Sequence, residues 1–336
     1  MEAPISGSNA PSTLVVTFKC DDRARDAIAR AIGDAGTIVY LTDVPAGDRA
    51  ATLESADVAL AFNTGTDLAP GEAASLAGAR LIQFISAGVD FIPLANLPDG
   101  VPVACNGGGY AEPMAEHGLA MALAAMKRLF VEHDKMRQGT FDQFRRNRML
   151  AGSVCGILGF GGIGIATARV MRALGARIYA VNRRGSTDEP VDWIGTVEQQ
   201  ERLFREADVL VLSAPLTPAT ERMIDASVLA QMKPDAILVN LARGEIIDEA
   251  ALWSHLKANP DFTACIDAWW IEPVRHGEFR TSYDFLNLPN VIGSPHNSAS
   301  AFGWYTVALA RAANNARRAL VGETPSFIVP PADRMM

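Results

Sequence analysis

Three side chains in the second half of the sequence are of types that together can transfer a proton beside a bound anion. Arg243 follows the apolar run AILVNL, Glu272 follows FTACID, and His296 follows NVIG. A histidine can exchange a proton at neutral pH because its ordinary pKa is about 6.5, and a carboxylate can hold the second nitrogen of its ring. The planar guanidinium of an arginine suits a carboxylate.

The placement of these residues favours a functional site more than their types do. A lone arginine, glutamate or histidine is usually an exposed or structural residue. Here each follows a predicted strand, and open α/β sheets bind ligands at the carboxyl edge of their strands. Without such a context, His133, His255 and His276 are expected at the surface, and His117 is expected to pack or to support other side chains.

A glycine-rich turn stands between two further predicted strands, SVCGIL and ARIYAV. Gly159 would allow a tight turn, Gly161 the close approach of a pyrophosphate, and Gly164 the close packing of a helix on a strand. In this context the pattern predicts dinucleotide binding, whereas the same letters alone would also suit a flexible loop. The residues assigned to the cofactor here are Gly159, Phe160, Gly161, Gly162, Ile163 and Gly164.

The second of these strands ends in Asn182, Arg183 and Arg184. An enzyme that uses NAD carries an acidic residue at this point, which binds the ribose hydroxyl groups. Two guanidinium groups and an amide donor suit a 2′-phosphate instead, because they can form charge-assisted hydrogen bonds with it. The sequence therefore predicts NADP as the preferred cofactor, and the alternative is a pair of solvated surface arginines.

Strand-like runs that alternate with helical stretches organise the chain into two α/β parts. LVVTF, TIVY, DVALAF, LIQFI and VPVA in the first third are nearly continuous in apolar residues, as in strands covered by helices on both faces. One long helix is expected from Pro113 to about Gln138, and a helix that packs back on the first part is expected from Ala299. We predict two doubly wound parallel-sheet domains: a flavodoxin-like substrate domain of residues 1–106 and 299–336, and a Rossmann coenzyme domain of residues 107–298.

Composition and charge disfavour several other classes of protein. The chain has 336 residues, of which 49% are hydrophobic and 20% charged, as in soluble globular domains. Its net charge of −8 disfavours binding to nucleic acid or acidic membranes. No apolar stretch approaches the roughly 18 residues of a membrane span, and the start MEAPISGSNAPS lacks the pattern of a signal peptide. From these two features we expect a cytoplasmic protein. The four cysteines are isolated and have no metal-binding spacing, so no metal site is expected.

Taken together, the motifs resemble the D-isomer-specific 2-hydroxyacid dehydrogenase family, to which phosphoglycerate dehydrogenase and glyoxylate/hydroxypyruvate reductase belong. The resemblance rests on SAGVD, AEPMAEHGLAMAL, GFGGIG, SAPLTPATERMI, NLARGEIID, DAWWIEP and SPHNSA, which occur in the family's order over nearly the whole chain. It implies NADPH-dependent reduction of small 2-oxo acids, such as glyoxylate or hydroxypyruvate, to D-2-hydroxy acids. Formate dehydrogenases share the fold but carry Gln at the position of Glu272, which argues against that activity.

The resemblance also implies roles for single residues. His296 would be the acid, Glu272 would hold its ring and stabilise the imidazolium, and Arg243 would bind the substrate carboxylate and polarise the carbonyl group. The substrate would contact the backbone of Ala87 and Gly88 as well as Arg243 and His296, and the alternative for SAGVD is an ordinary turn at the end of a strand. Contacts with the cofactor are implied for Ala214, Pro215, Leu216, Thr220, Ala242 and Asp267, of which Asp267 would bind the nicotinamide carboxamide.

The chain departs from the family pattern between Glu272 and His296, where VRHGEFRTSYDF lengthens the interval. Arg275, His276 and Arg280 of this segment could either rim the substrate pocket or belong to a solvated loop. Relatives dimerise through the coenzyme domain, with helices near Pro113 to Phe130 at the two-fold axis, which implies a homodimer. The chain departs from many relatives in the dimer arm, where Phe141 replaces Trp. The alternative function is a dinucleotide-sensing binding protein, like the corepressors built on this scaffold, and turnover of a 2-oxo acid would distinguish the two.

Overall fold

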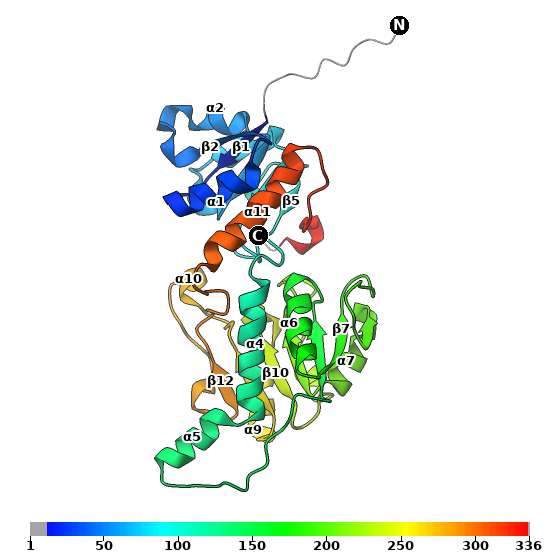
Figure 1. The fold of residues 1–336 in the computed structure, drawn as a ribbon. Helices are drawn as coiled ribbons and strands as arrows, with labels where there is room; N and C mark the ends of the chain where they lie inside the picture. The colour runs from blue at the N-terminus through cyan, green and yellow to red at the C-terminus, as the bar shows by residue number, and fades with distance from the viewer. Residues whose placement is uncertain (1–11, 335–336) are drawn as a thin grey trace. The chain divides into compact units, whose positions relative to one another are not determined.

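The computed structural model describes residues 12–334, which divide into two compact units (Figure 1). Unit 1 contains the described residues up to Gly109 and from Tyr305 onwards, and unit 2 contains residues 110–304. The division lies a few residues beyond each predicted boundary, because the glycine turn at 107–109 stays with unit 1 and the last long helix starts only at Trp304. The predicted lack of a signal peptide concerns a start of the chain that lies outside the described residues.

Unit 1 is built on a five-stranded parallel sheet with the order β2-β1-β3-β4-β5. This is the strand order of flavodoxin-like doubly wound sheets, so the predicted fold of this part is confirmed. The last strand is shorter than the predicted run VPVA, because Pro102 has no N–H group for the ladder. The strands are β1 (Thr13–Val16), β2 (Thr37–Tyr40), β3 (Val58–Ala61), β4 (Leu81–Phe84) and β5 (Val103–Ala104).

Helices cover both faces of this sheet. Ile28 of α1 and Leu309 of α11 are buried in one cluster with Leu14, while Leu53 of α2 is buried in a second cluster on the other face. The last helix begins later than predicted because Gly303, with φ of 71°, interrupts the chain just before it. The helices of unit 1 are α1 (Asp22–Ile32), α2 (Arg49–Glu54), α3 (Thr64–Asp67) and α11 (Trp304–Leu320).

Unit 2 is built on a seven-stranded parallel sheet with the order β12-β11-β10-β9-β6-β7-β8. This order is that of the Rossmann fold with one strand added beside it, which confirms the predicted fold class. The strand β8 was not predicted, since so short a run carries no periodicity. The strands are β6 (Val154–Leu158), β7 (Arg177–Val181), β8 (Trp193–Gly195), β9 (Val209–Leu212), β10 (Ile237–Asn240), β11 (Thr263–Ile266) and β12 (Val291–Gly293).

The single long helix predicted from Pro113 to about Gln138 is wrong. Arg128 adopts a left-handed conformation, with φ of 54°, and separates two helices. The first of them, α4, packs against α6, β10 and β11 of unit 2 (Figure 1). The helices of unit 2 are α4 (Ala111–Met126), α5 (Leu129–Arg137), α6 (Gly162–Ala173), α7 (Gln200–Glu206), α8 (Ala226–Leu229), α9 (Glu249–Ala258) and α10 (Pro273–His276).

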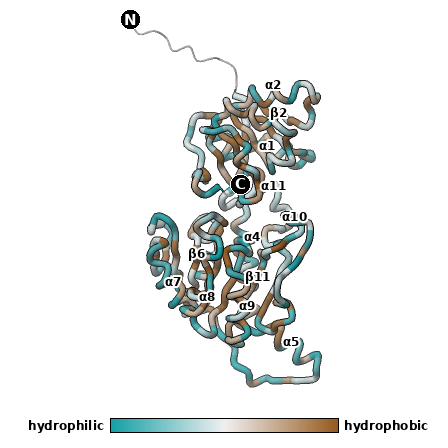
Figure 2. Tube along the Cα trace, turned by 180° about the vertical axis from the view of Figure 1, so that it is seen from behind, coloured by the Kyte–Doolittle hydropathy of each residue, from teal (hydrophilic) through white to brown (hydrophobic). Residues whose placement is uncertain are grey.

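Hydrophobic side chains concentrate along the strands of unit 2. Figure 2 shows hydrophobic residues along β11 and many hydrophilic residues along α7 at the surface. Every residue of β6 and β9 is buried, as expected for strands that helices cover on both faces. The rigid sheet that results presents the residues after each strand at one edge.

Aromatic packing anchors the long segment 274–285. The ring of Tyr283 stacks on Trp253 with centroids 5.4 Å apart, and the fully buried ring of Phe285 stacks on Trp270 at 5.2 Å. Such pairs contribute beyond the burial of their area. The end of the segment therefore belongs to the core of unit 2, whereas residues 276–280 are exposed, as in the alternative of a solvated loop.

Candidate active site

The three candidate catalytic residues lie at the carboxyl edge of the unit 2 sheet. Arg243 follows β10, Glu272 follows β11 after a short turn, and His296 follows β12. Because β10, β11 and β12 are parallel neighbours, their carboxyl ends meet at one edge. The structure thus gathers at one edge three residues that are spread over positions 243 to 296 of the sequence.

Glu272 and His296 form a direct pair. The ring atom Nδ1 of His296 lies 2.9 Å from Oε1 and 2.8 Å from Oε2 of Glu272. A carboxylate only accepts, so Nδ1 carries a proton and Nε2 is the atom that can exchange one. The side chain of Glu272 is 9% exposed and that of His296 is 33% exposed. The buried carboxylate therefore fixes the ring from inside the protein, while the ring remains accessible to solvent or a ligand.

The surroundings of Glu272 favour its ionised form. Burial raises the pKa of Glu272, but the hydrogen bond and charge of His296, the N–H of Trp269 and the charge of Arg243 act against it. The balance places the pKa of Glu272 below its ordinary value of 4.5. Glu272 is therefore a carboxylate at neutral pH, and it stabilises a positive charge on the imidazole ring of His296.

His296 stands in a turn that the surrounding residues hold in an unfavourable conformation. Its φ is 49°, in the left-handed region that residues other than glycine seldom adopt. The N–H of His296 donates to the carbonyl oxygen of Asp267 at 2.9 Å. The carboxylate of Asp267 accepts from Oγ of Ser294 at 2.5 Å and from the N–H groups of Asn297 and Ser298 at 3.2 and 3.3 Å.

The structure shows what Asp267 does within the protein itself. Its side chain is fully buried, and its oxygens accept hydrogen bonds from the turn around His296. Asp267 therefore holds this turn, and its bond to the nicotinamide carboxamide, which the family resemblance implied, stays a prediction. The sequence pattern missed Ser294, although its position two residues before His296 was the available signal.

A second turn presents Arg243. The buried amide of Asn240 donates to the carbonyl oxygen of Arg243 at 2.9 Å and accepts from the N–H of Ala242 at 3.0 Å. A Cβ atom on Gly244 would lie 2.3 Å from the backbone of Trp269, so glycine is required there. The guanidinium of Arg243 is partly exposed and donates to the carbonyl oxygen of Ala242 at 2.8 Å. The sequence analysis did not identify Asn240. The available indication was a polar residue at the end of an otherwise apolar strand.

The glycine-rich turn is packed as the fingerprint predicts. Gly159 has φ of 97°, and a Cβ atom there would lie 2.4 Å from the backbone nitrogen of Ala214. A Cβ atom on Gly164 would lie 2.6 Å from the carbonyl oxygen of Gly159. Phe160 is buried, and Ile163 packs against the same hydrophobic cluster. Only glycine fits at the two packed positions, so the turn and α6 lie tightly against β6 and β9.

The start of α6 leaves room for an anion. The helix begins at Gly162, no side chain caps its N-terminus, and a Cβ atom on Gly161 would meet nothing within 4 Å. Free N–H groups at a helix start, with open space before them, suit a phosphate group. This arrangement fits the pyrophosphate of a dinucleotide.

The residues after β7 lie next to this turn. The N–H groups of Gly159 and Phe160 both donate to the carbonyl oxygen of Val181, at 3.0 Å each, and Val181 ends β7. Arg183 and Arg184 follow it at the exposed surface. Charged groups at this place are therefore within reach of the adenosine end of a dinucleotide bound at α6.

The side chain of Asn182 forms hydrogen bonds within its own turn, and its contact with a 2′-phosphate stays a prediction because the amide nitrogen has two hydrogens to donate. Its side-chain oxygen accepts from the N–H groups of Arg184 and Gly185 at 3.0 and 2.7 Å, and its amide nitrogen donates to the carbonyl oxygen of Ser186 at 3.0 Å. Asn182 thus shapes the turn that carries Arg183 and Arg184.

The other expected cofactor contacts lie on the turn after β9. Ala214 and Leu216 are buried, whereas Pro215 is exposed. The hydroxyl of Thr220 donates to the carbonyl oxygen of Pro215 at 2.7 Å and accepts from the N–H of Thr217 at 2.8 Å. Thr220 therefore fixes this turn beside the glycine-rich one, and its contact with a cofactor stays a prediction, as does that of Ala242.

The charged residues of the long segment after Glu272 have partners within unit 2. Arg275 forms an ion pair with Glu245 at 2.7 Å, and Nδ1 of His276 accepts from the N–H of Glu272 at 3.0 Å. Arg280 pairs with Glu278 at the exposed surface. Arg275 and His276 therefore brace the turns of Arg243 and Glu272.

Ala87 and Gly88 belong to unit 1. They lie half-buried in the bend that directly follows β4, at the carboxyl edge of the unit 1 sheet. Their contact with the substrate carboxylate stays a prediction.

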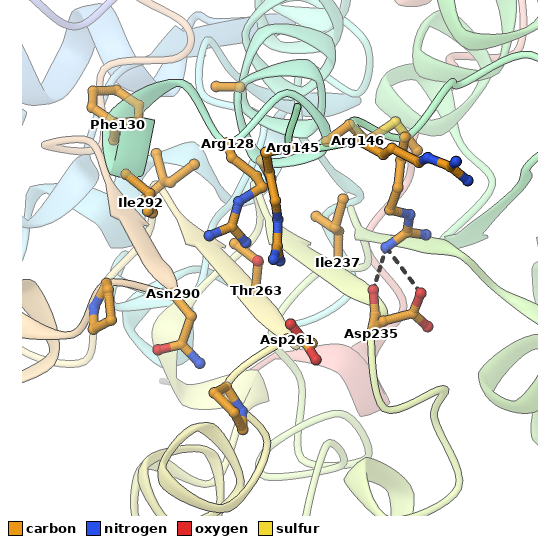
Figure 3. Close-up of a pocket in the computed structure, with 17 residues that line it drawn as sticks. Arg128, Phe130, Arg145, Arg146, Asp235, Ile237, Asp261, Thr263, Asn290 and Ile292 are labelled. Atoms are coloured by element: carbon orange, nitrogen blue, oxygen red, sulfur yellow. Dashed lines mark hydrogen bonds and ion pairs between the residues drawn. The ribbon is translucent and has the colours of Figure 1, made fainter. Parts of the chain in front are cut away.

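A cavity of about 550 Å³ in unit 2 lies away from this chemistry (Figure 3). Its lining includes Ile237, Thr263 and Ile292, which stand at or near the amino ends of β10, β11 and β12. Figure 3 shows that Arg128 and Arg145 point into it. Because the candidate catalytic residues follow the other ends of the same strands, the cavity and the site lie at opposite edges of the sheet.

Between residues 12 and 334, no group of three or more His, Cys, Asp or Glu side chains is placed to hold a metal ion. In the same part of the chain, no helix has both the length and the hydropathy that a membrane span requires.

Comparison with known proteins connects this geometry to a family. Residues 119–298 match the model of the D-isomer specific 2-hydroxyacid dehydrogenase NAD binding domain. A hydroxypyruvate reductase of Thermotoga maritima is 30% identical over 224 residues, which are 66% of this chain and 71% of that protein. A D-3-phosphoglycerate dehydrogenase of Methanocaldococcus jannaschii is 28% identical over 94% of this chain, but the match spans only 59% of that longer protein.

A solved structure matches the whole fold. A protein of Pyrobaculum aerophilum that was named as a candidate formate dehydrogenase is 27% identical, with a TM-score of 0.77 over 96% of this chain and 99% of that one. The likeness therefore covers both units, and the family model covers most of unit 2.

The lowered pKa of Glu272 predicts how stability responds to acid. A carboxyl group whose pKa is lower in the folded than in the unfolded chain stabilises the fold above its unfolded pKa, and this contribution is lost as pH falls through the folded pKa. On going from pH 6 to pH 3.5, the wild type should therefore lose a part of its stability that Glu272→Gln does not lose. Thermal unfolding of both proteins across this range measures the difference, and parallel curves would contradict the assignment.

Proposed function

The chain belongs to the D-isomer-specific 2-hydroxyacid dehydrogenase family, and from this premise we propose that it reduces small 2-oxo acids to D-2-hydroxy acids with NADPH. Glyoxylate and hydroxypyruvate are the substrates that we favour. The observation that carries the proposal is the pair of His296 and Glu272, at 2.8 Å, beside the charge of Arg243. The glycine turn at the start of α6, in the same unit, supports it.

The residues of this chain supply the proton and the anchor. The bound nicotinamide supplies the hydride that reduces the carbonyl carbon. His296 donates the proton on Nε2 to the carbonyl oxygen, while its Nδ1–H stays bonded to Glu272. The carboxylate of Glu272 stabilises the protonated ring before the transfer and fixes its orientation throughout. In the reverse direction, the neutral ring accepts the proton of the 2-hydroxy group.

Arg243 binds the carboxylate of the substrate and polarises its carbonyl group. A guanidinium can form two parallel hydrogen bonds with a carboxylate, which fixes the orientation of the adjacent carbonyl carbon. The hydrogen bond of Asn240 and the close packing of Gly244 fix the turn that carries Arg243. In this proposal, the backbone of Ala87 and Gly88 adds donors to the same carboxylate.

The acid–base pair disfavours a formate dehydrogenase. Oxidation of formate to carbon dioxide transfers a hydride and protonates no carbonyl oxygen, so a histidine held as a proton donor would have no task. The pair of His296 and Glu272 therefore supports reduction of a carbonyl group.

Removal of the proton donor tests the proposal. The exchange His296→Asn should lower kcat for the reduction of glyoxylate or hydroxypyruvate by about 100-fold or more, since this is the usual size of general acid catalysis. Binding of NADPH should persist, because the glycine turn lies at a different strand. Initial rates with a panel of 2-oxo acids, and a fluorescence titration with NADPH, measure both.

His255→Asn is the matched control, because His255 stands on α9 and is also partly buried. It should keep the wild-type rate. Near-normal kcat in His296→Asn would remove His296 from the mechanism, and a wild type that turns over none of the acids would favour a dinucleotide-sensing protein instead.

The exposed arginines after β7 support NADPH over NADH. Each can form charge-assisted hydrogen bonds with a 2′-phosphate, and no acidic residue precedes them in the turn 182–184 to repel it. A hydrogen bond to a charged group contributes about 1.5–3 kcal/mol. Loss of one arginine is therefore expected to lower kcat/KM with NADPH but not with NADH.

The exchange Arg183→Ala or Arg184→Ala should lower kcat/KM with NADPH by roughly ten- to a hundredfold and leave NADH almost unaffected. Arg177→Ala is the control, since Arg177 is an exposed arginine at the other end of the same strand. Initial rates with both cofactors at constant ionic strength decide the point. A wild type that prefers NADH, or equal losses with both cofactors, would make these arginines ordinary surface residues.

A second copy of this chain is the partner that we propose. Phe141 and Phe144, in the segment after α5, are 73% and 83% exposed, and Leu129, Phe130 and Met136 of α5 are more than half exposed as well. Apolar side chains that cluster at a surface mark an interaction site. The family resemblance, in which the coenzyme domains pair, favours a homodimer formed by this face of unit 2.

Sedimentation at micromolar concentration tests the homodimer. The wild type should sediment as a dimer, and Phe141→Asp with Phe144→Asp should shift it to the monomer, because two charges would be buried at the interface. Phe302→Asp, at a fully exposed phenylalanine outside this face, should leave the dimer intact. A monomeric wild type would contradict the proposal, and so would a dimer that persists when Phe141→Asp and Phe144→Asp are combined.

A further inference from the structure

His117 connects the helix α4 to the turn that carries His296. Its Nε2 lies 2.9 Å from Oγ of Ser294 and 3.7 Å from Oδ1 of Asp267. The hydroxyl of Ser294 lies 2.5 Å from the same oxygen of Asp267. All of these residues belong to unit 2. They form a continuous chain from α4 to the carboxylate that holds the catalytic turn.

The direction of these hydrogen bonds follows from counting protons. The oxygens of Asp267 accept from the backbone N–H groups of Asn297 and Ser298, as a carboxylate does. The single hydroxyl hydrogen of Ser294 therefore points to Asp267, and the Ser294 oxygen is left to accept from His117. It follows that Nε2 of His117 carries a proton.

The carboxylate of Asp267 needs these donors. Its side chain is fully buried, and a buried charge is costly unless hydrogen bonds surround it. Without the donor of His117, the hydroxyl of Ser294 loses the contact that fixes its orientation. The carboxylate would then hold the N–H groups of the turn less firmly.

His296 depends on that turn for its conformation. Its left-handed φ of 49° is unfavourable for a histidine and persists only when the surrounding residues hold it. Contacts that hold it run through Asp267, whose carboxylate accepts from the turn and whose carbonyl oxygen accepts the N–H of His296. A shift of the turn would move Nε2 of His296 away from the position from which it donates.

We propose that His117 is a positioning residue of this enzyme, which holds His296 in place through Ser294 and Asp267. The inference rests on the proposed function for its kinetic consequence, but the contact itself does not. The polar contacts of His117 run to Ser294 and Asp267 rather than to His296 itself. Its loss is therefore expected to lower kcat without weakening the binding of the cofactor.

Two exchanges at this position separate a positioning role from simple packing. His117→Leu removes the donor and keeps a similar volume, whereas His117→Gln keeps an N–H donor near the place of Nε2. We expect kcat for 2-oxo acid reduction to fall about tenfold in the Leu variant and to return to within about threefold of wild type in the Gln variant. The affinity for NADPH should stay unchanged in both.

A double-mutant cycle tests the path. Ser294→Ala should lower kcat about as much as His117→Leu, and the combined variant should lose little more than either alone, since both break the same chain of contacts. His255→Leu makes the same exchange on α9 and should leave kcat unchanged. Equal losses in His117→Leu and His117→Gln, or additive losses in the double variant, would overturn the proposal.

The protonation of His117 offers a test that does not depend on turnover. In ¹⁵N spectra of the histidine side chains, the signals of His117 are identified by their absence in His117→Gln. We expect a proton on Nε2, and a ring protonated only on Nδ1 would overturn the proposal. If the wild type reduces no 2-oxo acid, the proposed function fails while this spectrum still decides whether the contact exists.

Discussion

The buried carboxylate of Glu272 fixes one nitrogen of His296, and the carboxyl edge of the unit 2 sheet is arranged around this pair. An ionised carboxylate that is 9% exposed is costly unless donors surround it. The imidazole of His296 and the N–H of Trp269 meet that requirement, and the charge of Arg243 adds to it. The same contacts leave the outer nitrogen of the ring as the atom that exchanges a proton.

Two rigid turns make this pair possible. The turn of His296 is unfavourable by itself and is held by the buried Asp267, while the turn of Arg243 lies so close to the backbone of Trp269 that only glycine fits at position 244. The aromatic packing of the segment 274–285 supports both from one side. The positions of the candidate catalytic side chains thus depend on packing and on buried hydrogen bonds formed by other residues.

The sequence predicted the fold class because strands that are buried on both faces consist of short, nearly continuous apolar segments. It also placed the candidate catalytic residues at strand ends, since the motifs stand directly after such runs. It could not predict the break at Arg128, because helical periodicity continues across it. The burial of Asp267 and its bond to Ser294 depend on contacts between separate strands and on proton counting, which spacing does not encode.

The pH dependence of both directions of the reaction tests the central claim most directly. If His296 donates the proton, reduction of a 2-oxo acid requires the protonated ring and oxidation of the 2-hydroxy acid requires the neutral ring. As pH rises, kcat/KM for reduction should therefore fall and kcat/KM for oxidation should rise. Profiles that rise or fall together in both directions would contradict the account.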